Sequence, residues 1–382
     1  MKKTPHAIKR YQRPLALLGG ITASQFLAEY WQKKPLLIRA AIPQFAGVIS
    51  AEELAGLACE EVVQARMVKK IKDVWQLEQG PFDEKYFSKL PAKNWTLLVQ
   101  GVNHHSQEAS ELLKQFNFIP HARLDDLMVS YAPDGGGVGP HFDSYDVFLL
   151  QGQGKRRWRI SDQQDLSLVE NAPLRILKNF DTTQEWLLEP GDMLYLPPHI
   201  AHWGIAEGDS MTYSIGFRAP SAQELGNEFL SYLQENCALT GMYQDPNLKP
   251  QRHPAKIGSA MLAQVTDMLS NIRWTQADIA KFLGQYLSEP KSHVIFDPPR
   301  NISIATFKSR LEKKGIRLDL KTQMLFHGQH YFINGEMVEL PKSSANTMRE
   351  LADHRYLAPE SCTDTIVLER LYEWYRAGYL QF

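Results

Sequence analysis

The stretch DGGGVGPHFDSYD, from Asp134 to Asp146, decides how the rest of the chain is interpreted. Four glycines and a proline lead directly into a His-Phe-Asp triplet. A glycine-rich loop that binds phosphate is followed by a helix whose N-terminus meets the anion. Here the strand-like sequence YDVFLLQG follows instead. The stretch therefore does not predict a phosphate loop, and it indicates a site within β-structure.

His141 and Asp143 are the first candidate ligands of a metal ion. Side chains alternate between the two faces of a strand, so if His141 begins a strand, both side chains point the same way. One imidazole and one carboxylate make up two thirds of the 2-His-1-carboxylate set, which binds non-haem Fe(II) and leaves positions open for substrate and oxygen. The same spacing also arises by chance on surfaces, so a third ligand has to come from elsewhere.

The segment EPGDMLYLPPHIAHW, residues 189–203, supplies a candidate third ligand. Gly191, Pro197 and His202 resemble the second signature of cupin barrels, in which a turn and an inward strand precede a proline and a histidine at the mouth of the strand. His199 is a competing candidate, but that signature usually has glycine there. We predict that His202 is the ligand and that His199 is a solvated loop residue.

Short apolar segments dominate residues 126–220 and indicate a β-rich domain. They are rich in β-branched and aromatic residues, and Gly, Pro or Asp separates them. The segments are LMVSYA, YDVFLLQG, RRWRI, WLLEPGDMLYLPP and SMTYSIGFRA. Strands at this spacing are typical of a sandwich or a barrel.

Basic residues after the turn GQG are candidates for binding an acidic co-substrate. An iron oxygenase needs a source of electrons, and if that source is 2-oxoglutarate, its distal carboxylate requires a fixed cation. A returning strand would carry one basic side chain into the barrel. The candidates are Lys155, Arg156, Arg157 and Arg159. An edge strand with solvated charges is the alternative, but Trp158 and Ile160 indicate that one face is buried.

These residues resemble the JmjC-domain 2-oxoglutarate oxygenases, and among them the bacterial ribosomal oxygenases. The resemblance covers residues 20–290 and rests on His141-x-Asp143, the run QGQGKRRWRI, the segment that ends in His202, and YSIGFRAP. It implies a mainly β core, a double-stranded β-helix of the cupin/JmjC type with flanking helices. It also implies iron on His141, Asp143 and His202, and the distal carboxylate of 2-oxoglutarate on Arg156, with a further contact from the Ser130 hydroxyl.

The resemblance also implies the reaction and its target. It predicts a dioxygenase that uses Fe(II), 2-oxoglutarate and O2 to hydroxylate the β-carbon of an arginine in large-subunit ribosomal protein sixteen. Asp134, Tyr145 and Asp146 are the nearest candidates for contact with that arginine. The glycines ahead of His141 would let a polypeptide substrate lie close to the backbone beside the metal.

Three alternatives to this function stay open. One is a JmjC oxygenase with another target, such as a ribosomal histidine or a methyl-lysine, because substrate specificity lies in loops that the metal motif does not define. Another is a cupin-type metal enzyme that does not use 2-oxoglutarate, against which Arg156 argues. The last is a binding module with an inactive barrel, against which the complete ligand set argues.

The rest of the chain predicts two further units. Helical periodicity returns after residue 220, in SAQELGNEFLSYLQENCALTG, GSAMLAQVTDMLSNIRW and TQADIAKFLGQYLSE. A helix, SIATFKSRLEKKG, and a hairpin around Asn334-Gly335, a pair suited to a type I′ turn, come later. With the resemblance, we expect an oxygenase domain over residues 1–220, an α-helical dimerisation domain over 221–296 and a C-terminal winged-helix-like α+β domain over 297–382.

The composition limits the cellular locations and the binding partners that we expect for this protein. The 382 residues include 42 Lys and Arg and 43 Asp and Glu, so the net charge of −1 favours neither nucleic acid nor an anionic membrane. Basic and acidic residues also nearly balance after residue 291, which argues against DNA binding there. The three cysteines form no CxxC pair, and no apolar run is long enough to span a bilayer. We expect a cytoplasmic protein, and the family resemblance implies that it is a homodimer.

Overall fold

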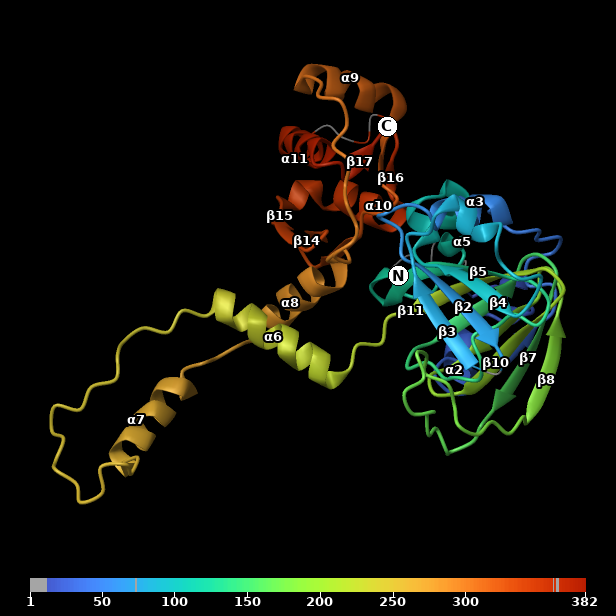
Figure 1. Cartoon of the computed structure of the whole chain (residues 1–382). Coiled ribbons are helices and arrows are strands. Elements are labelled where there is room, and N and C mark those ends of the chain that lie inside the picture. Colours follow the sequence, from blue (N-terminus) through green and yellow to red (C-terminus); the bar gives the residue numbers. More distant parts are fainter. Residues whose placement is uncertain (1–11, 73, 360, 362–363) are drawn as a thin grey trace.

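A computed structural model describes residues 12–72, 74–359, 361 and 364–382 (Figure 1). A β-domain, coloured blue to green, is joined through three helices to a smaller α+β unit, coloured orange to red. In the described part of the chain, no helix combines the length and the apolar character needed to cross a membrane.

The larger sheet of the β-domain has eight antiparallel strands in the order β1-β9-β6-β11-β5-β4-β2-β3. The strands are β1 (Leu36–Ile38), β2 (Ala65–Ile71), β3 (Val74–Gln79), β4 (Trp95–Val99), β5 (Leu124–Ala132), β6 (Val147–Gln151), β9 (Met193–Leu196) and β11 (Ser210–Phe217). Neighbours such as β6 and β11 are far apart in the sequence, which is typical of a double-stranded β-helix rather than a meander.

The smaller sheet closes the barrel on the other side. Its strands are β7 (Lys155–Ser161), β8 (Gln184–Leu188) and β10 (Ala201–Glu207), in the order β10-β7-β8. The glycine loop extends this sheet, because Gly135 N–H donates to Ala206 O and Ala206 N–H donates to Gly136 O. An isolated antiparallel bridge joins His141 to His202. The expected mainly β core with flanking helices is confirmed.

Short helices cover the outer face of the larger sheet and form the main core with it. They are α2 (Ala23–Glu29), α3 (Ala51–Leu57), α4 (Glu84–Phe87) and α5 (Gln107–Lys114), with 3-10 turns η1 (Ala16–Leu18), η2 (Val102–His104) and η3 (His121–Arg123). Phe26 of α2 packs on Phe148 and Tyr195 of the sheet, and all three side chains are fully buried. A capping box of Ser50 and Glu53 begins α3.

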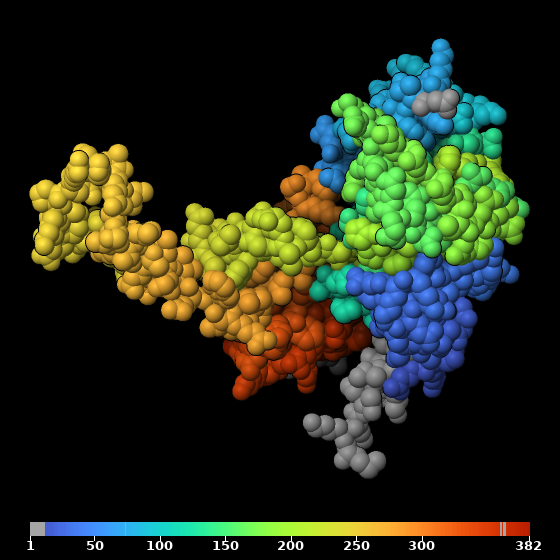
Figure 2. Space-filling model, turned by 90° about the horizontal axis from the view of Figure 1, so that it is seen from below, coloured from blue at the N-terminus to red at the C-terminus, as the bar shows by residue number. Residues whose placement is uncertain are grey.

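Three helices connect the two folded units. They are α6 (Ala222–Asn236), α7 (Ser259–Ser270) and α8 (Gln276–Ser288), which confirms the helices expected after residue 220. Figures 1 and 2 show α7 and its flanking segments reaching away from the body of the molecule. None of the α7 residues is buried, whereas α8 packs against β13, β14 and β15 of the C-terminal unit.

The C-terminal unit contains two small sheets, β16-β12-β17 and β13-β14-β15. Its elements are α9 (Ile304–Lys314), β12 (Ile316–Leu318), β13 (Met324–His327), β14 (His330–Ile333), β15 (Glu336–Glu339), η4 (Lys342–Ser344), α10 (Ala345–His354), β16 (Tyr356–Leu357), α11 (Thr365–Arg376) and β17 (Leu380–Gln381). Asn334 and Gly335 join β14 to β15 with φ of 50° and 86°. Positive φ at both positions confirms the predicted type I′ hairpin.

Candidate metal centre

His141, Asp143 and His202 meet at one point of the barrel. One ligand atom from each lies within 4.8 Å of the others. The route by which they meet differs from the expected one, because His141 makes only a single bridge and β6 begins at Val147. Asp143 therefore lies in a loop, and the prediction that strand alternation would direct its side chain was wrong.

Backbone hydrogen bonds hold the three residues together. His141 N–H donates to His202 O at 2.9 Å, and His202 N–H donates to His141 O at 2.7 Å. Asp143 is held from the opposite side, since its carbonyl oxygen accepts from His199 N–H at 2.8 Å. His199 has a φ of 66°, in the left-handed region that favours glycine. The backbone at this position, where the cupin signature usually has glycine, therefore keeps a conformation typical of glycine although the residue is histidine. The His199 ring is exposed and is not in the ligand cluster.

Both imidazole rings have one nitrogen committed to a neighbouring carbonyl group. Nδ1 of His141 lies 2.9 Å from Gly139 O, and Nδ1 of His202 lies 2.9 Å from Ile200 O. When Nδ1 carries the proton and donates, Nε2 keeps its lone pair. Nε2 of His202 lies 3.6 Å from Oδ2 of Asp143. The arrangement presents two imidazole nitrogens and one carboxylate oxygen, which is a donor set for Fe(II).

Burial keeps His202 neutral. Only 2% of its surface is exposed. Burial and, next, the neighbouring His141 lower the pKa of His202 to about 4, although Asp143 acts in the opposite direction. A neutral imidazole is the form that binds a metal ion, so little proton competition remains at neutral pH.

Arg156 carries a buried positive charge toward the barrel interior. Nη1 donates to Oγ of Ser130 on β5 at 3.3 Å, while Nε and Nη2 are buried and have no hydrogen-bond partner in the described part of the chain. Burial lowers the pKa of Arg156 to about 10, so the guanidinium stays charged at neutral pH. A buried cation with two unused donors is costly unless an anion binds. The residues present therefore fit a carboxylate ligand.

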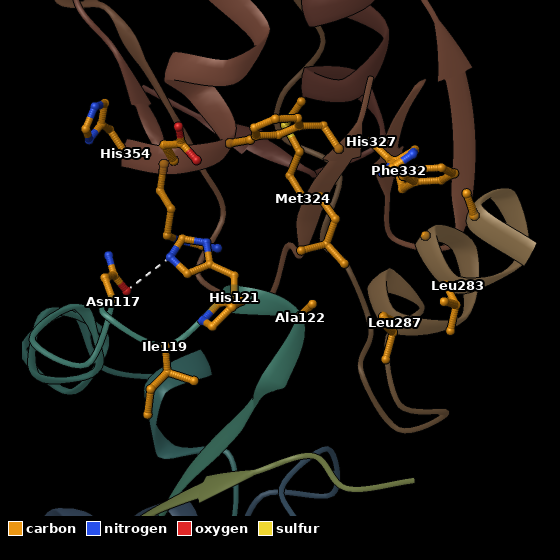
Figure 3. A pocket seen from close by; sticks show the side chains of 18 of the residues that line it. Asn117, Ile119, His121, Ala122, Leu283, Leu287, Met324, His327, Phe332 and His354 are labelled. Atoms are coloured by element: carbon orange, nitrogen blue, oxygen red, sulfur yellow. Dashed lines mark hydrogen bonds between the residues drawn. The ribbon is translucent and has the colours of Figure 1, made fainter. Parts of the chain in front are cut away.

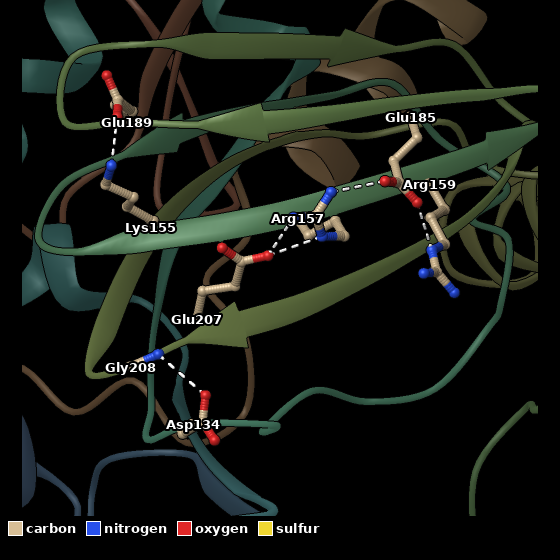
Figure 4. A network of polar contacts seen from close by, with 8 residues as sticks. All are labelled: Asp134, Lys155, Arg157, Arg159, Glu185, Glu189, Glu207 and Gly208. Atoms are coloured by element: carbon tan, nitrogen blue, oxygen red, sulfur yellow. Dashed lines mark hydrogen bonds and ion pairs between the residues drawn. The ribbon is translucent and has the colours of Figure 1, made fainter.

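The other basic side chains of β7 lie on its outer face, where glutamates pair with them (Figure 4). The ion pairs are Lys155–Glu189, Arg157–Glu185, Arg157–Glu207 and Arg159–Glu185. Alternation along the strand thus leaves Arg156 as the inward cation of this run.

The glycine loop is packed more tightly than a substrate passage would require. A Cβ atom at Gly136 would overlap the carbonyl oxygen of Trp95, and one at Gly137 would overlap that of Gly204. These oxygens belong to the backbones of β4 and β10, so moving them would cost free energy by disturbing the paired strands. Close backbone packing therefore accounts for these two glycines without a polypeptide beside them.

The three residues considered for substrate contact lie in different environments. Asp146 is fully buried, accepting hydrogen bonds from Tyr195 Oη at 2.6 Å and Gln32 Nε2 at 2.9 Å, so its role is structural. Asp134 is exposed and accepts from Gly208 N–H at 3.2 Å (Figure 4). Tyr145 is 41% exposed. Only Asp134 and Tyr145 remain accessible to a substrate.

A cavity of about 1320 Å³, separate from the donor cluster, lies between the β-domain, α8 and the C-terminal unit (Figure 3). Apolar side chains of α8 and the C-terminal sheet line one side, and η3 lines the other, where His121 Nε2 lies 3.0 Å from Asn117 Oδ1. Among the described residues, the possible metal-binding cluster is in the barrel and not here. Nothing in the sequence indicated this cavity, because its walls come from three units.

Two family models match the chain. The JmjC domain matches residues 111–225, and the ROXA-like winged helix matches residues 271–381. The first match spans Ser130, Arg156 and the three clustered residues, and the second spans α8 and the C-terminal unit.

This chain is similar in sequence to proteins that are named as ribosomal protein hydroxylases or ribosomal oxygenases. The Escherichia coli ribosomal protein uL16 3-hydroxylase is 34% identical over 347 residues, 89% of this chain and 91% of the relative. A probable ribosomal oxygenase of Haemophilus influenzae is 43% identical over 233 residues, 60% of this chain and 55% of the relative.

Solved structures agree. An X-ray structure of E. coli YcfD has a TM-score of 0.84 and 32% identity, covering 95% of this chain and 98% of the other. A structure of YcfD, a ribosomal oxygenase, in complex with cobalt and 2-oxoglutarate has a TM-score of 0.81 with the same coverage. The fold, the site and these relatives agree, and the chain belongs to the JmjC-domain ribosomal oxygenases.

Proposed function

We propose that this protein is an Fe(II)- and 2-oxoglutarate-dependent hydroxylase of a large-subunit ribosomal protein, with the β-carbon of an arginine as its target. The observation that carries the proposal is the buried guanidinium of Arg156 in the barrel that also holds the three-residue donor cluster. A metal site alone would suit many cupin-type enzymes. The added cation supports a reaction that consumes a dicarboxylate.

Five side chains carry the proposed chemistry. His141, Asp143 and His202 would hold the metal, and Arg156 with Ser130 would hold the distal carboxylate of 2-oxoglutarate. When bound, iron, 2-oxoglutarate and O2 together supply the oxidising power that hydroxylates an unactivated C–H bond. The chain itself positions the ligands through backbone hydrogen bonds and fixes the co-substrate with a preorganised cation.

Mass spectrometry of ribosomal proteins tests this function. We expect treatment with the enzyme, Fe(II), 2-oxoglutarate and O2 to add one oxygen atom to one arginine of the uL16 protein, with succinate formed in equal amount. The His202→Ala variant is the control. Oxygen added to a histidine, or removal of a lysine methyl group, would favour the alternative JmjC targets, and turnover without succinate would favour a cupin-type enzyme.

We also propose that the protein is a cytoplasmic homodimer that assembles through residues 221–296. These residues would form a dimerisation domain between an oxygenase domain over residues 1–220 and a winged-helix-like domain over residues 297–382. Support comes from exposed apolar side chains, since Leu230 on α6, Leu262 on α7 and Trp274 between α7 and α8 are 66%, 63% and 53% exposed. Light scattering after size exclusion should give twice the chain mass, and Leu262→Glu with Trp274→Ser should give the single mass. A wild-type monomer would refute the dimer.

A further inference from the structure

The inner wall of the barrel contains an indole N–H group whose role the proposed function does not yet explain. Nε1 of Trp158 is buried and finds no hydrogen-bond partner among the described residues, and the same holds for Nε and Nη2 of Arg156 on the same strand. The two nitrogens of Arg156 are accounted for by a distal carboxylate. An indole N–H buried without an acceptor costs free energy, so an acceptor at the Trp158 nitrogen would be favourable, and Trp158 lies beside the cation that would bind the co-substrate.

The register of β7 and β10 places Trp158 between the two ends of the site. Arg156 pairs with Ala206, Trp158 with Gly204, and Ile160 with His202. Residues two apart share a face of the strand, so Trp158 lies one inward step from Arg156 toward the metal. The Trp158 ring centroid is 6.0 Å from the Arg156 guanidinium carbon and 5.9 Å from the His202 ring centroid.

Gly204 explains how an indole fits at this point. A Cβ at position 204 would lie 2.7 Å from the Trp158 ring, so the cross-strand neighbour has to be glycine. The ring is 5% exposed and belongs to an apolar cluster with Leu149 and Leu194. These surroundings supply packing but no acceptor. A molecule that enters the barrel could supply the acceptor that these surroundings lack.

We infer that Trp158 donates its indole N–H to an oxygen atom of the bound dicarboxylate co-substrate. The inference rests on the proposed function and extends it. A 2-oxoglutarate molecule bound at both Arg156 and the metal would extend alongside Trp158. All polar atoms of 2-oxoglutarate are hydrogen-bond acceptors. An indole nitrogen is a donor only, so it matches these oxygens and rejects a ligand that presents a donor. Trp158 is thus a binding residue for the co-substrate.

Calorimetry with the Mn(II)-loaded protein tests the hydrogen bond. Trp158→Phe keeps a ring in place and removes the N–H, and we expect it to weaken 2-oxoglutarate binding on the order of tenfold while Mn(II) affinity stays unchanged. Trp374→Phe is the matched control, because Trp374 is also buried with an unpartnered Nε1 but lies in the C-terminal core. Unchanged 2-oxoglutarate affinity in Trp158→Phe would overturn the inference.

Indole resonances of the unmodified protein provide a second test, in which the variant serves only to assign the Trp158 signal. The ¹⁵N–¹H signal that is missing in Trp158→Phe should move downfield in wild type when 2-oxoglutarate is added to the Zn(II)-loaded protein, and the Trp374 signal should not. A Trp158 signal that stays in place while 2-oxoglutarate binds refutes the hydrogen bond and leaves the proposed function intact. Absence of any 2-oxoglutarate binding by wild type would refute the proposed function itself.

Discussion

Arg156 Nη1 and Ser130 Oγ come from strands of opposite sheets and meet inside the barrel at 3.3 Å. This one hydrogen bond leaves Nε and Nη2 of the guanidinium without an acceptor among the described residues, although Arg156 is only 4% exposed. The ligand-free protein therefore carries an unpaired buried charge, which is costly. A buried, unpaired cation lowers the stability of the ligand-free protein, and the same cation raises the affinity for an anionic ligand.

Replacing Arg156 by Met should separate these two effects. We expect 2-oxoglutarate affinity to fall roughly 100-fold, because two charge-assisted hydrogen bonds are lost. The ligand-free melting temperature should stay the same or rise, since a buried charge has been removed. Calorimetry and thermal unfolding measure the two quantities. Arg157→Met, on the outer face, should leave the affinity unchanged, and a loss there instead would mean that the cation was wrongly assigned.

Alanine at His141, Asp143 or His202 should abolish both metal binding and 2-oxoglutarate turnover. Each change removes one of three donors, so the stabilisation that Co(II) confers in thermal unfolding should disappear. His199→Gly is the informative control. Glycine tolerates the φ of 66° and keeps the N–H that holds the Asp143 carbonyl. Full activity in that variant would confirm His202 over its neighbour, and loss of metal binding would reverse the assignment.

Acidification should destabilise the protein through His104. Burial, then positive neighbours such as His105 and Lys291, lower the pKa of His104 to about 3, from 6.5 in the unfolded chain. The unfolded state therefore binds more protons below pH 6.5, and stability falls as the pH drops from about 6.5 toward 3. Between pH 6.5 and 5 the loss is about 2 kcal/mol at most, since one pKa unit is about 1.4 kcal/mol.

Urea denaturation at several pH values measures this dependence. His104→Gln should make the decline in the free energy of unfolding between pH 6.5 and 5 shallower, and the part that His202 contributes through its own lowered pKa should remain. His253→Gln, at an exposed position, should leave the decline unchanged. An equally steep decline in His104→Gln would place the responsible group elsewhere.

The three candidate ligands could be predicted because local sequence patterns contain them. His141 and Asp143 follow a turn-rich loop, and His202 follows a proline and an apolar strand, so each appears at the end of a recognisable element. Alternation along β7 showed that one basic residue faces inward. It could not select Arg156, because the choice depends on the register with β10, and the family resemblance made the selection.

Other features depend on contacts between distant segments, which periodicity does not report. Asp143 reaches the metal site because His199, far along the chain, binds its carbonyl group, not because a strand directs it. The unpartnered indole of Trp158 depends on Gly204 across the sheet. The glycines ahead of His141 suggested space for a substrate, whereas the carbonyl groups of Trp95 and Gly204 occupy that space.

Gly137→Ala distinguishes the two explanations of this loop. The added methyl group would overlap the Gly204 carbonyl oxygen, and we expect a loss of about 1–3 kcal/mol in the free energy of unfolding. Peptide hydroxylation and uncoupled 2-oxoglutarate turnover should then fall together, because the loop bridges to the metal site. Gly226→Ala, in a helix with open space around it, should reduce neither. Selective loss of peptide hydroxylation at unchanged stability would show instead that the loop admits the substrate, as its sequence first suggested.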